Sequence, residues 1–147
     1  MKAVARRRRK ARGLTLIEVL LVLAILLIMA SLVVTAYVPI QRRAYMNAAL
    51  TQIKAFKGPL QTYYLDMNDY PTTAQGLDAL RSPPPDLPDP SKWQGPYLDS
   101  EVPLDPWGRP YQYEYPGKHD LEAPDIWSVG PDGVDGTDDD VVSWTVR

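Results

Sequence analysis

The chain has 147 residues, the size of one domain with appendages. Its formal net charge of −2 is unevenly placed: residues 1–13 carry seven basic side chains and no acid, which leaves nine basic and eighteen acidic side chains, a net charge of −9, on the other 134 residues. A basic segment directly before an apolar run favours a membrane-topology signal over a nucleic-acid-binding arm. The chain has no cysteine, which excludes disulfides, so packing or a bound metal must stabilise the domain.

The apolar run begins directly after the basic segment. Residues 19–34 contain no charge, and the flanking residues extend the apolar helix to about 25 residues, where a bilayer core needs about 20. We therefore expect a transmembrane helix over residues 14–38. Glu18 is an exception inside it, because a carboxylate in hydrocarbon is strongly unfavourable unless it is partnered. The sequence thus predicts a functional partner for Glu18.

An amphipathic helix is expected to continue from the apolar one. Pro39 and the pair Gly58-Pro59 interrupt the helical pattern, but the apolar face continues in phase beyond Pro59. We therefore predict one helix from about residue 15 to residue 66, with bends at these prolines. Six apolar residues spaced three and four apart form the buried face of its second half: Ala49, Ile53, Phe56, Leu60, Tyr63 and Met67.

The rest of the chain is rich in proline and glycine. Thr72 or Thr73 is expected to cap a short helix over residues 74–81. The proline-rich residues 82–110 are expected to form a long loop that its two tryptophans pin to the domain. Runs of aromatic and β-branched residues predict three strands, at residues 111–115, 125–129 and 141–146.

An acidic, glycine-rich loop separates the last two predicted strands. Hard carboxylate and carbonyl oxygens are the ligands that calcium prefers, and five crowded carboxylates with no basic residue between Lys118 and Arg147 favour a bound cation. The spacing is not that of an EF-hand, and an ordinary solvated turn is the alternative. The loop contains Asp132, Asp135, Asp138, Asp139 and Asp140, with Gly130, Gly133 and Gly136 between them.

Catalytic chemistry finds little support in the sequence. His119 is the only histidine, no cysteine is present, and no phosphate-binding glycine loop occurs. His119 reads as a loop residue, while Asp66 and Asp69 read as the solvated end of a helix. We therefore expect a protein that is not an enzyme.

The basic segment and apolar run together carry a processing signal. An ordinary secretory signal, cut before Tyr37, would have a shorter apolar core and no acid, and would release a periplasmic binding or enzymatic domain. The stretch "RG" followed by "LTLIEVLLVLAIL" instead resembles the class III signal of type IV pilins and type II secretion pseudopilins. The resemblance implies that prepilin peptidase cuts after Gly13, that Leu14 becomes the N-methylated first residue, and that Glu18 is the family's assembly glutamate.

Further motifs narrow the resemblance. The stretches "DMNDYPTTAQGLDAL", "VPLDPWGRPYQY" and "DIWSVGPDGVDGTDDDVVSW" are similar to the major pseudopilins of type II secretion. This implies an α+β, pilin-like fold: a long N-terminal helix, half transmembrane and half amphipathic, packed on a small antiparallel β-sheet with a C-terminal calcium loop. Residues 1–13 would be the leader, residues 14–38 the transmembrane and filament-core helix, and residues 39–147 the periplasmic domain.

The resemblance also implies the function and the partners. The chain would polymerise into a helical homopolymer that drives folded proteins across the outer membrane, working with minor pseudopilins and the inner-membrane assembly platform. A type IV pilin for adhesion or DNA uptake is the alternative. The calcium ion would be bound by the side chains of Asp132, Asp139 and Asp140 and by the backbone carbonyls of Val129 and Val134.

Two positions depart from the family pattern. The family commonly has a glycine and a proline in the apolar helix, near positions occupied here by Leu27 and Thr35. Neither residue breaks a helix as glycine or proline does. We therefore expect the helix to stay continuous through residue 38 in a filament, with any break moved to Pro39.

Overall fold

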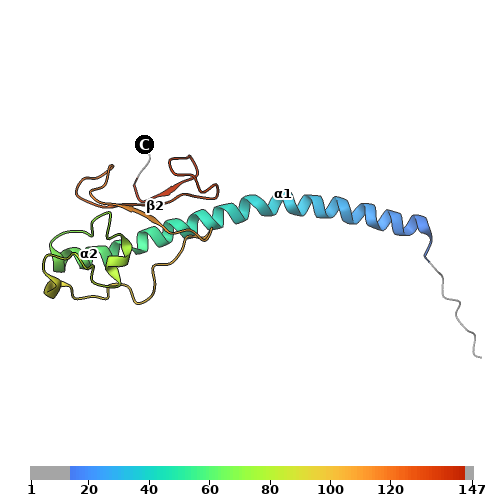
Figure 1. The fold of residues 1–147 in the computed structure, drawn as a ribbon. Coiled ribbons are helices and arrows are strands. Elements are labelled where there is room, and N and C mark those ends of the chain that lie inside the picture. Colours follow the sequence, from blue (N-terminus) through green and yellow to red (C-terminus); the bar gives the residue numbers. More distant parts are fainter. Residues whose placement is uncertain (1–13, 145–147) are drawn as a thin grey trace, which may run out of the picture. The chain divides into compact units, whose positions relative to one another are not determined.

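The computed structural model describes residues 14–144, with the side chains of residues 32–36 excepted. The expected leader, with the cleavage residue Gly13, lies outside these residues. The chain divides into two compact units, Met1–Ile40 and Gln41–Arg147, which are described separately below. The elements in chain order (Figure 1) are helices α1 (Leu16–Ala55) and α2 (Lys57–Met67), 3₁₀-helices η1 (Leu77–Leu80) and η2 (Pro90–Lys92), and strands β1 (Gln112–Glu114), β2 (Asp125–Ser128) and β3 (Val141–Val142).

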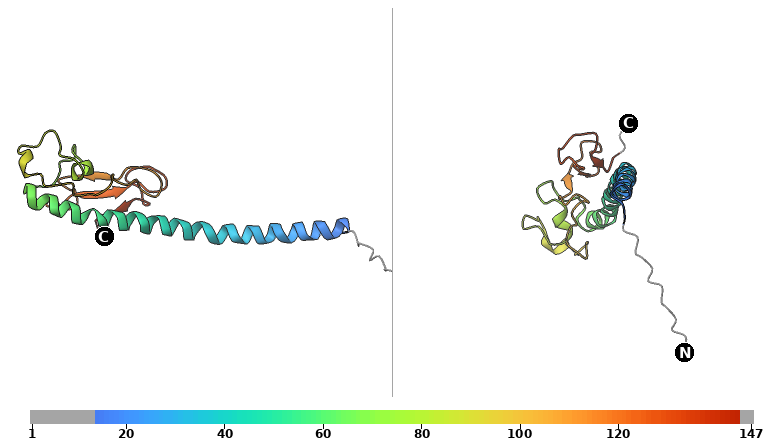
Figure 2. Two further views of the ribbon diagram at one scale, coloured as in Figure 1. Left: turned by 90° about the horizontal axis from the view of Figure 1, so that it is seen from below. Right: turned by 90° about the vertical axis from the view of Figure 1, so that its right-hand side faces the viewer.

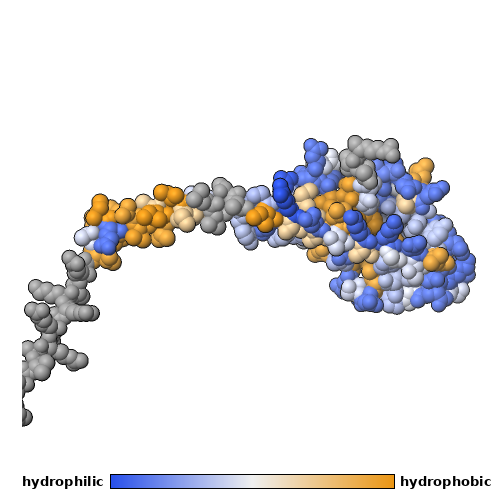
Figure 3. Space-filling model, turned by 180° about the vertical axis from the view of Figure 1, so that it is seen from behind, coloured by the Kyte–Doolittle hydropathy of each residue, from blue (hydrophilic) through white to orange (hydrophobic). Residues whose placement is uncertain are grey.

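The first unit contains the apolar part of α1. Its large apolar side chains from Leu14 to Met29 are between 43% and 78% exposed. Figure 3 shows these apolar side chains gathered along the helix. Within the described part of the chain, no helix combines the length and the apolarity that crossing a membrane requires. Helix α1 continues through Pro39, so this proline does not end the helix, as predicted.

The junction between α1 and α2 lies at Phe56. The Phe56 backbone keeps a right-handed helical conformation, its N–H donates to Gln52 O at 3.2 Å, and its carbonyl accepts from Leu60 N at 3.0 Å. Pro59 has no N–H to donate to the carbonyl of Ala55, and its ring crowds the same carbonyl. The interruption therefore falls one turn before the proline that causes it, and the helical path continues beyond it, as the in-phase apolar face predicted.

The core of the second unit forms along the predicted apolar face. Ala49, Ile53, Phe56, Leu60 and Tyr63 are each at most 2% exposed, and Met67 packs against the same cluster. Helix α2 ends where Asn68 adopts a left-handed conformation (φ 57°). In Figure 2, the sheet and the long loop cover one side of these helices. The amphipathic helix on a small sheet is thus confirmed.

The three strands form one antiparallel sheet in the order β1-β2-β3. Tyr113 pairs with Ile126, and Ser128 pairs with Val141. The side chains of all four are buried. All three predicted strands are present but shorter than expected; the third ends at Val142, and the last two residues of its predicted range lie outside the described residues.

The predicted helix over residues 74–81 is mostly wrong. Thr72 does act as a cap, because its hydroxyl accepts from Gln75 N at 3.3 Å while Gln75 Oε1 accepts from Thr72 N at 3.0 Å. The turn it caps then reaches Gly76, whose φ of 59° leaves the helical region. Only the 3₁₀-helix η1 follows.

The proline-rich loop is held on the domain by its tryptophans, as predicted. Trp93 Nε1 donates to the carbonyl of Ala79 at 3.1 Å. Trp107 meets the ring of Tyr45 edge-on, with ring centroids 6.1 Å apart. Both tryptophans are partly buried against the core.

Candidate functional site

The start of α1 is built around Thr15 and Glu18. The Thr15 side-chain oxygen accepts from Glu18 N at 3.3 Å, and its carbonyl accepts from Glu18 N at 3.1 Å and Val19 N at 3.2 Å. The Glu18 carboxylate therefore lies in the first turn, where the positive end of the helix dipole stabilises it by about 0.3–1 kcal/mol. The spacing Thr-x-x-Glu is a capping-box signature that would have placed this helix start from sequence.

The acidic loop, residues 129–140, runs from β2 to β3 and folds back on itself. Gly130 has a φ of 63°, and a Cβ on it would overlap the backbone oxygen of Asp139. The first arm of the loop, residues 129–133, and its second arm, residues 134–140, therefore touch backbone to backbone. Within the loop, Asp132 Oδ1 accepts from Val134 N at 2.9 Å, and Asp140 Oδ2 accepts from Gly136 N at 2.8 Å.

Three of the five expected metal ligands converge in the second arm. The Thr137 hydroxyl oxygen lies 2.6 Å from Asp139 Oδ1, 3.3 Å from the Val134 carbonyl oxygen and 3.5 Å from Asp140 Oδ1. Its hydrogen bond holds the pKa of the Asp139 carboxyl below its usual value. One hydroxyl thus sits among oxygens of the kind that calcium prefers.

The other two expected ligands belong to the first arm, and Asp132 lies within hydrogen-bonding reach of Asp139. Asp132 uses a carboxylate oxygen to cap the Val134 amide, and Val129 is buried directly after β2. Across residues 14–144, no three acidic or histidine side chains are close enough together to hold a metal ion. The oxygen donors fit calcium in chemistry, while Asp132 does not join Asp139 and Asp140 in a three-carboxylate cluster.

The residues considered for catalysis make structural contacts. His119 Nδ1 lies 2.8 Å from Asp125 Oδ2, a carboxylate that is 5% exposed, and its ring stacks on Trp144 with centroids 3.9 Å apart. Asp66 Oδ2 accepts from the hydroxyl of Tyr97 at 2.9 Å. These contacts tie the loop before β2 and the end of α2 to the rest of the second unit.

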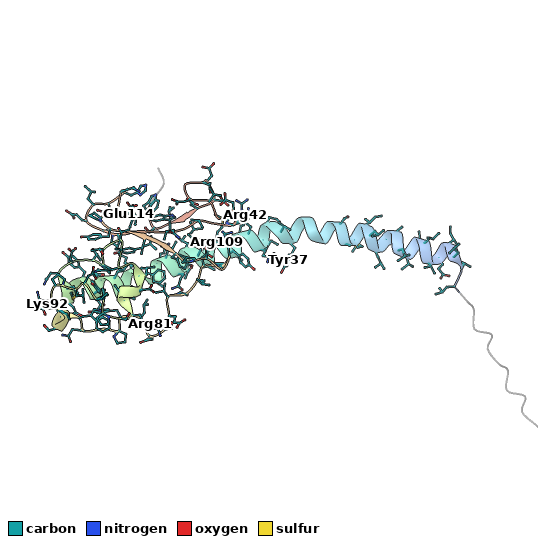
Figure 4. All side chains as sticks on the ribbon, viewed as in Figure 1. Tyr37, Arg42, Arg81, Lys92, Arg109 and Glu114 are labelled. Carbon is teal, nitrogen blue, oxygen red and sulfur yellow. The ribbon has the colours of Figure 1, made fainter. Side chains whose placement is uncertain are left out.

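One basic residue, which no sequence pattern pointed to, contacts the acidic loop. Arg109 (labelled in Figure 4) donates from its guanidinium to the carbonyls of Gly130 and Pro131. Its acceptors are backbone atoms more than twenty residues away, so neither charge pattern nor spacing points to the contact. The loop therefore has a cation near it, contrary to what the lack of basic residues from 119 to 146 implied.

Comparisons with known proteins assign the family. Residues 36–144 match the family described as "Type II secretion system (T2SS), protein G", and residues 8–34 match the "Prokaryotic N-terminal methylation motif". The chain is 42% identical over 140 residues to the type II secretion system core protein G of Aeromonas hydrophila, covering 95% of this chain and 96% of that protein. It is 40% identical over 141 residues to the core protein G of Pseudomonas aeruginosa, covering 93% and 97%.

A solved structure agrees with this assignment. The crystal structure of the major pseudopilin from the type 2 secretion system of enterohaemorrhagic Escherichia coli is similar, with a TM-score of 0.65 and 39% sequence identity. The similarity covers 75% of this chain and 95% of that chain. The predicted α+β arrangement, a long N-terminal helix packed on a small antiparallel sheet, is thereby confirmed, as is the resemblance to type II secretion pseudopilins in preference to type IV pilins. The chain belongs to the type II secretion system protein G family, whose members are structural pseudopilins.

Proposed function

We propose that this structural subunit of the type II secretion pseudopilus polymerises through the apolar part of α1 into a helical filament that drives folded proteins across the outer membrane. The role is mechanical, with no catalysis by the chain itself. The observation that carries the proposal is the composition of α1. Its large apolar side chains from Leu16 to Met29 are solvent-exposed in the single subunit, and Glu18 is the only charged residue between positions 14 and 41.

Processing would create the partner that Glu18 needs. We expect prepilin peptidase to remove residues 1–13 by cutting after Gly13, and Leu14 to be N-methylated. The new α-amino group is a cation, and the Glu18 carboxylate is placed in the first helical turn to meet it. Because a buried unpaired charge is strongly destabilising, Glu18 of one subunit would pair with the Leu14 amine of a neighbour and set the register of each added subunit.

Before it is assembled into the filament, the subunit would be anchored in the inner membrane. The seven basic side chains before the apolar run favour a cytoplasmic leader, by the positive-inside rule. Residues 14–38 would then form a single-pass transmembrane helix, and residues 39–147 would lie in the periplasm. Minor pseudopilins and the assembly platform of the inner membrane would be its partners, in addition to identical subunits.

Calcium would stabilise the acidic loop. The expected ligands are Asp132, Asp139 and Asp140 through their side chains, and Val129 and Val134 through their carbonyls. The convergence of oxygens around Thr137 supports this proposal, because a cation would relieve the repulsion among them. Asp132 would have to turn from the Val134 amide toward the ion.

Substitution of Glu18 tests the filament proposal. Glu18→Gln keeps the size of the side chain but removes its charge, and Glu101→Gln removes an exposed carboxylate of the second unit as a control. We expect both variants to be cleaved normally, measured by mass spectrometry of the mature chain. Glu18→Gln should yield at least about tenfold fewer filaments in electron micrographs, because an unpaired buried charge costs several kcal/mol. Filament yields equal to the Glu101→Gln control would contradict the proposal.

A further inference from the structure

We propose that Arg109 is the positioning residue of the acidic loop. Its guanidinium holds the first arm, residues 129–133, in place on the domain, so that the second arm can fold against it and present its oxygens to a cation. The part of this proposal that concerns the cation rests on the calcium site proposed above. The part that concerns the position of the loop does not.

The guanidinium contacts the first arm at three points. It donates from Nη1 to the carbonyl of Gly130 and from Nη2 to the carbonyl of Pro131, the latter at 3.3 Å. Gly133 lies flat against it: a Cβ on Gly133 would be 2.6 Å from the Arg109 Cζ. A forked, planar donor matches two neighbouring carbonyls in a way that a single ammonium does not.

Arg109 is itself fixed by a buried carboxylate. Asp105, 4% exposed, accepts at Oδ1 from Arg109 N at 2.8 Å and from Trp107 N at 3.0 Å. The Asp105 amide in turn donates to the carbonyl of Arg109 at 2.7 Å. The turn that carries Arg109 is thus closed by hydrogen bonds at both of its ends, and the side chain starts from a fixed backbone.

A second connection joins the same turn to the same arm. The hydroxyl of Ser128, a fully buried residue, donates to Asp105 Oδ2 and accepts from Gly130 N at 3.3 Å. Gly130 is therefore bound through its N–H by Ser128 and through its carbonyl by Arg109. The second arm touches Gly130 through the Asp139 backbone oxygen, so the position of Gly130 sets the position of Asp139.

The guanidinium of Arg109 donates to backbone carbonyls and not to the carboxylates of the loop. Among the described residues, the ion pairs of lysine and arginine join Arg81 to Glu101 and Lys118 to Glu114, and none involves Arg109. The Arg109 guanidinium therefore does not occupy the carboxylate oxygens of the second arm. Residues that orient metal ligands without touching the metal typically change affinity by 10–100-fold when they are substituted.

Calcium titration of the full chain in detergent separates positioning from charge. Arg109→Lys keeps the charge and loses the forked donor, Arg109→Gln loses both, and Arg81→Gln is a matched control on an exposed arginine. We expect both Arg109 variants to bind calcium about 10–100-fold more weakly than the unchanged chain, and the control to bind equally well. Unchanged affinity in Arg109→Lys together with tighter binding in Arg109→Gln would overturn the proposal, because Arg109 would then act only by repelling the ion.

Hydrogen exchange in chelator tests the position of the loop without calcium. We expect the amides of Gly130 and of residues 132–136 to exchange at least about tenfold faster in Arg109→Gln and Arg109→Lys than in Arg81→Gln, because a local opening easier by about 1.4 kcal/mol gives this factor. Equal exchange in all of these variants would overturn the proposal. If the unchanged chain binds no calcium, the proposed metal site fails, and this exchange experiment alone decides the role of Arg109.

Discussion

The rings of Phe56 and Tyr111 meet edge to face, with centroids 5.4 Å apart and planes at 76°. Phe56 is fully buried at the junction of α1 and α2, and Tyr111 directly precedes β1. This aromatic contact is where the helices of the second unit meet the sheet. The junction between α1 and α2 therefore lies inside the core, because the fully buried ring of Phe56 packs there against Tyr111.

Truncation of Phe56 tests how much this contact contributes. Phe56→Ala should lower the free energy of unfolding by about 3–5 kcal/mol, because a large buried aromatic side chain leaves a cavity that the core fills only in part. Leu65→Ala on the exposed side of α2, where the side chain is 71% exposed, is the control and should change it by less than about 0.5 kcal/mol. Urea unfolding followed by tryptophan fluorescence measures both, and equal midpoints would contradict the assigned role.

Alanine substitutions at two glycines of the acidic loop distinguish the cost of backbone strain from the cost of disrupting close packing. Gly130 and Gly136 both have positive φ angles, but only Gly130 lies against another backbone, at Asp139, while nothing is within 4 Å of the Cβ position of Gly136. Gly136→Ala should lower the free energy of unfolding by about 1–2 kcal/mol, the strain of a left-handed alanine. Gly130→Ala should lower it by more, because the two arms must also move apart; equal losses in urea unfolding would show that they do not touch.

The sequence predicted the elements that depend on local periodicity. Ile53, Phe56 and Leu60 were placed on the buried face because a helix repeats every three to four residues, whatever it packs against. The prediction of a helix over residues 74–81 was wrong because Gly76 has a positive φ. Glycine can adopt either sign of φ, and the packing of the rest of the fold determines which one it adopts. The contact of Arg109 with Gly130 could not be predicted for a related reason. Every residue has a backbone carbonyl, so no sequence pattern marks the one that accepts the hydrogen bond.

Calcium should stabilise the second unit through the acidic loop. At ten to one hundred times its dissociation constant, a bound ligand adds about 1.4–2.7 kcal/mol to the free energy of unfolding. We expect a higher melting temperature in calcium than in chelator, and no such difference in Asp139→Asn or Asp140→Asn. Asp99→Asn, on an exposed loop carboxylate, is the control and should keep the difference. Identical melting curves of the unchanged chain in calcium and in chelator would remove the metal from the account.

The buried tyrosines predict a loss of stability at alkaline pH. Burial, with a smaller contribution from the Asp105 charge, raises the pKa of Tyr111 from 10.0 to about 12. Below pH 10 the residue is neutral in both states, so its contribution is fully present; between pH 10 and 12 only the unfolded chain loses the proton, and stability falls by about 1.4 kcal/mol per pH unit for each such group.

Replacement of Tyr111 isolates one of these groups. Because burial also raises the pKa of Tyr113, the unchanged domain should lose stability with a slope that reflects several tyrosines. Tyr111→Phe should be less steep between pH 10 and 12, by about 1.4 kcal/mol per pH unit, in urea unfolding at each pH. Parallel pH profiles of the two proteins would show that Tyr111 ionises equally in both states.

The mature N-terminus tests the central claim most directly. A pseudopilus subunit that pairs Glu18 with a neighbour's amine must begin at Leu14, and the family-typical modification adds one methyl group to that amine. We therefore predict that mass spectrometry of the chain from membranes of cells with a prepilin peptidase finds residues 14–147 with N-methyl-Leu14. A chain that begins at Tyr37, or one that keeps residues 1–13 in the presence of the peptidase, would contradict the account.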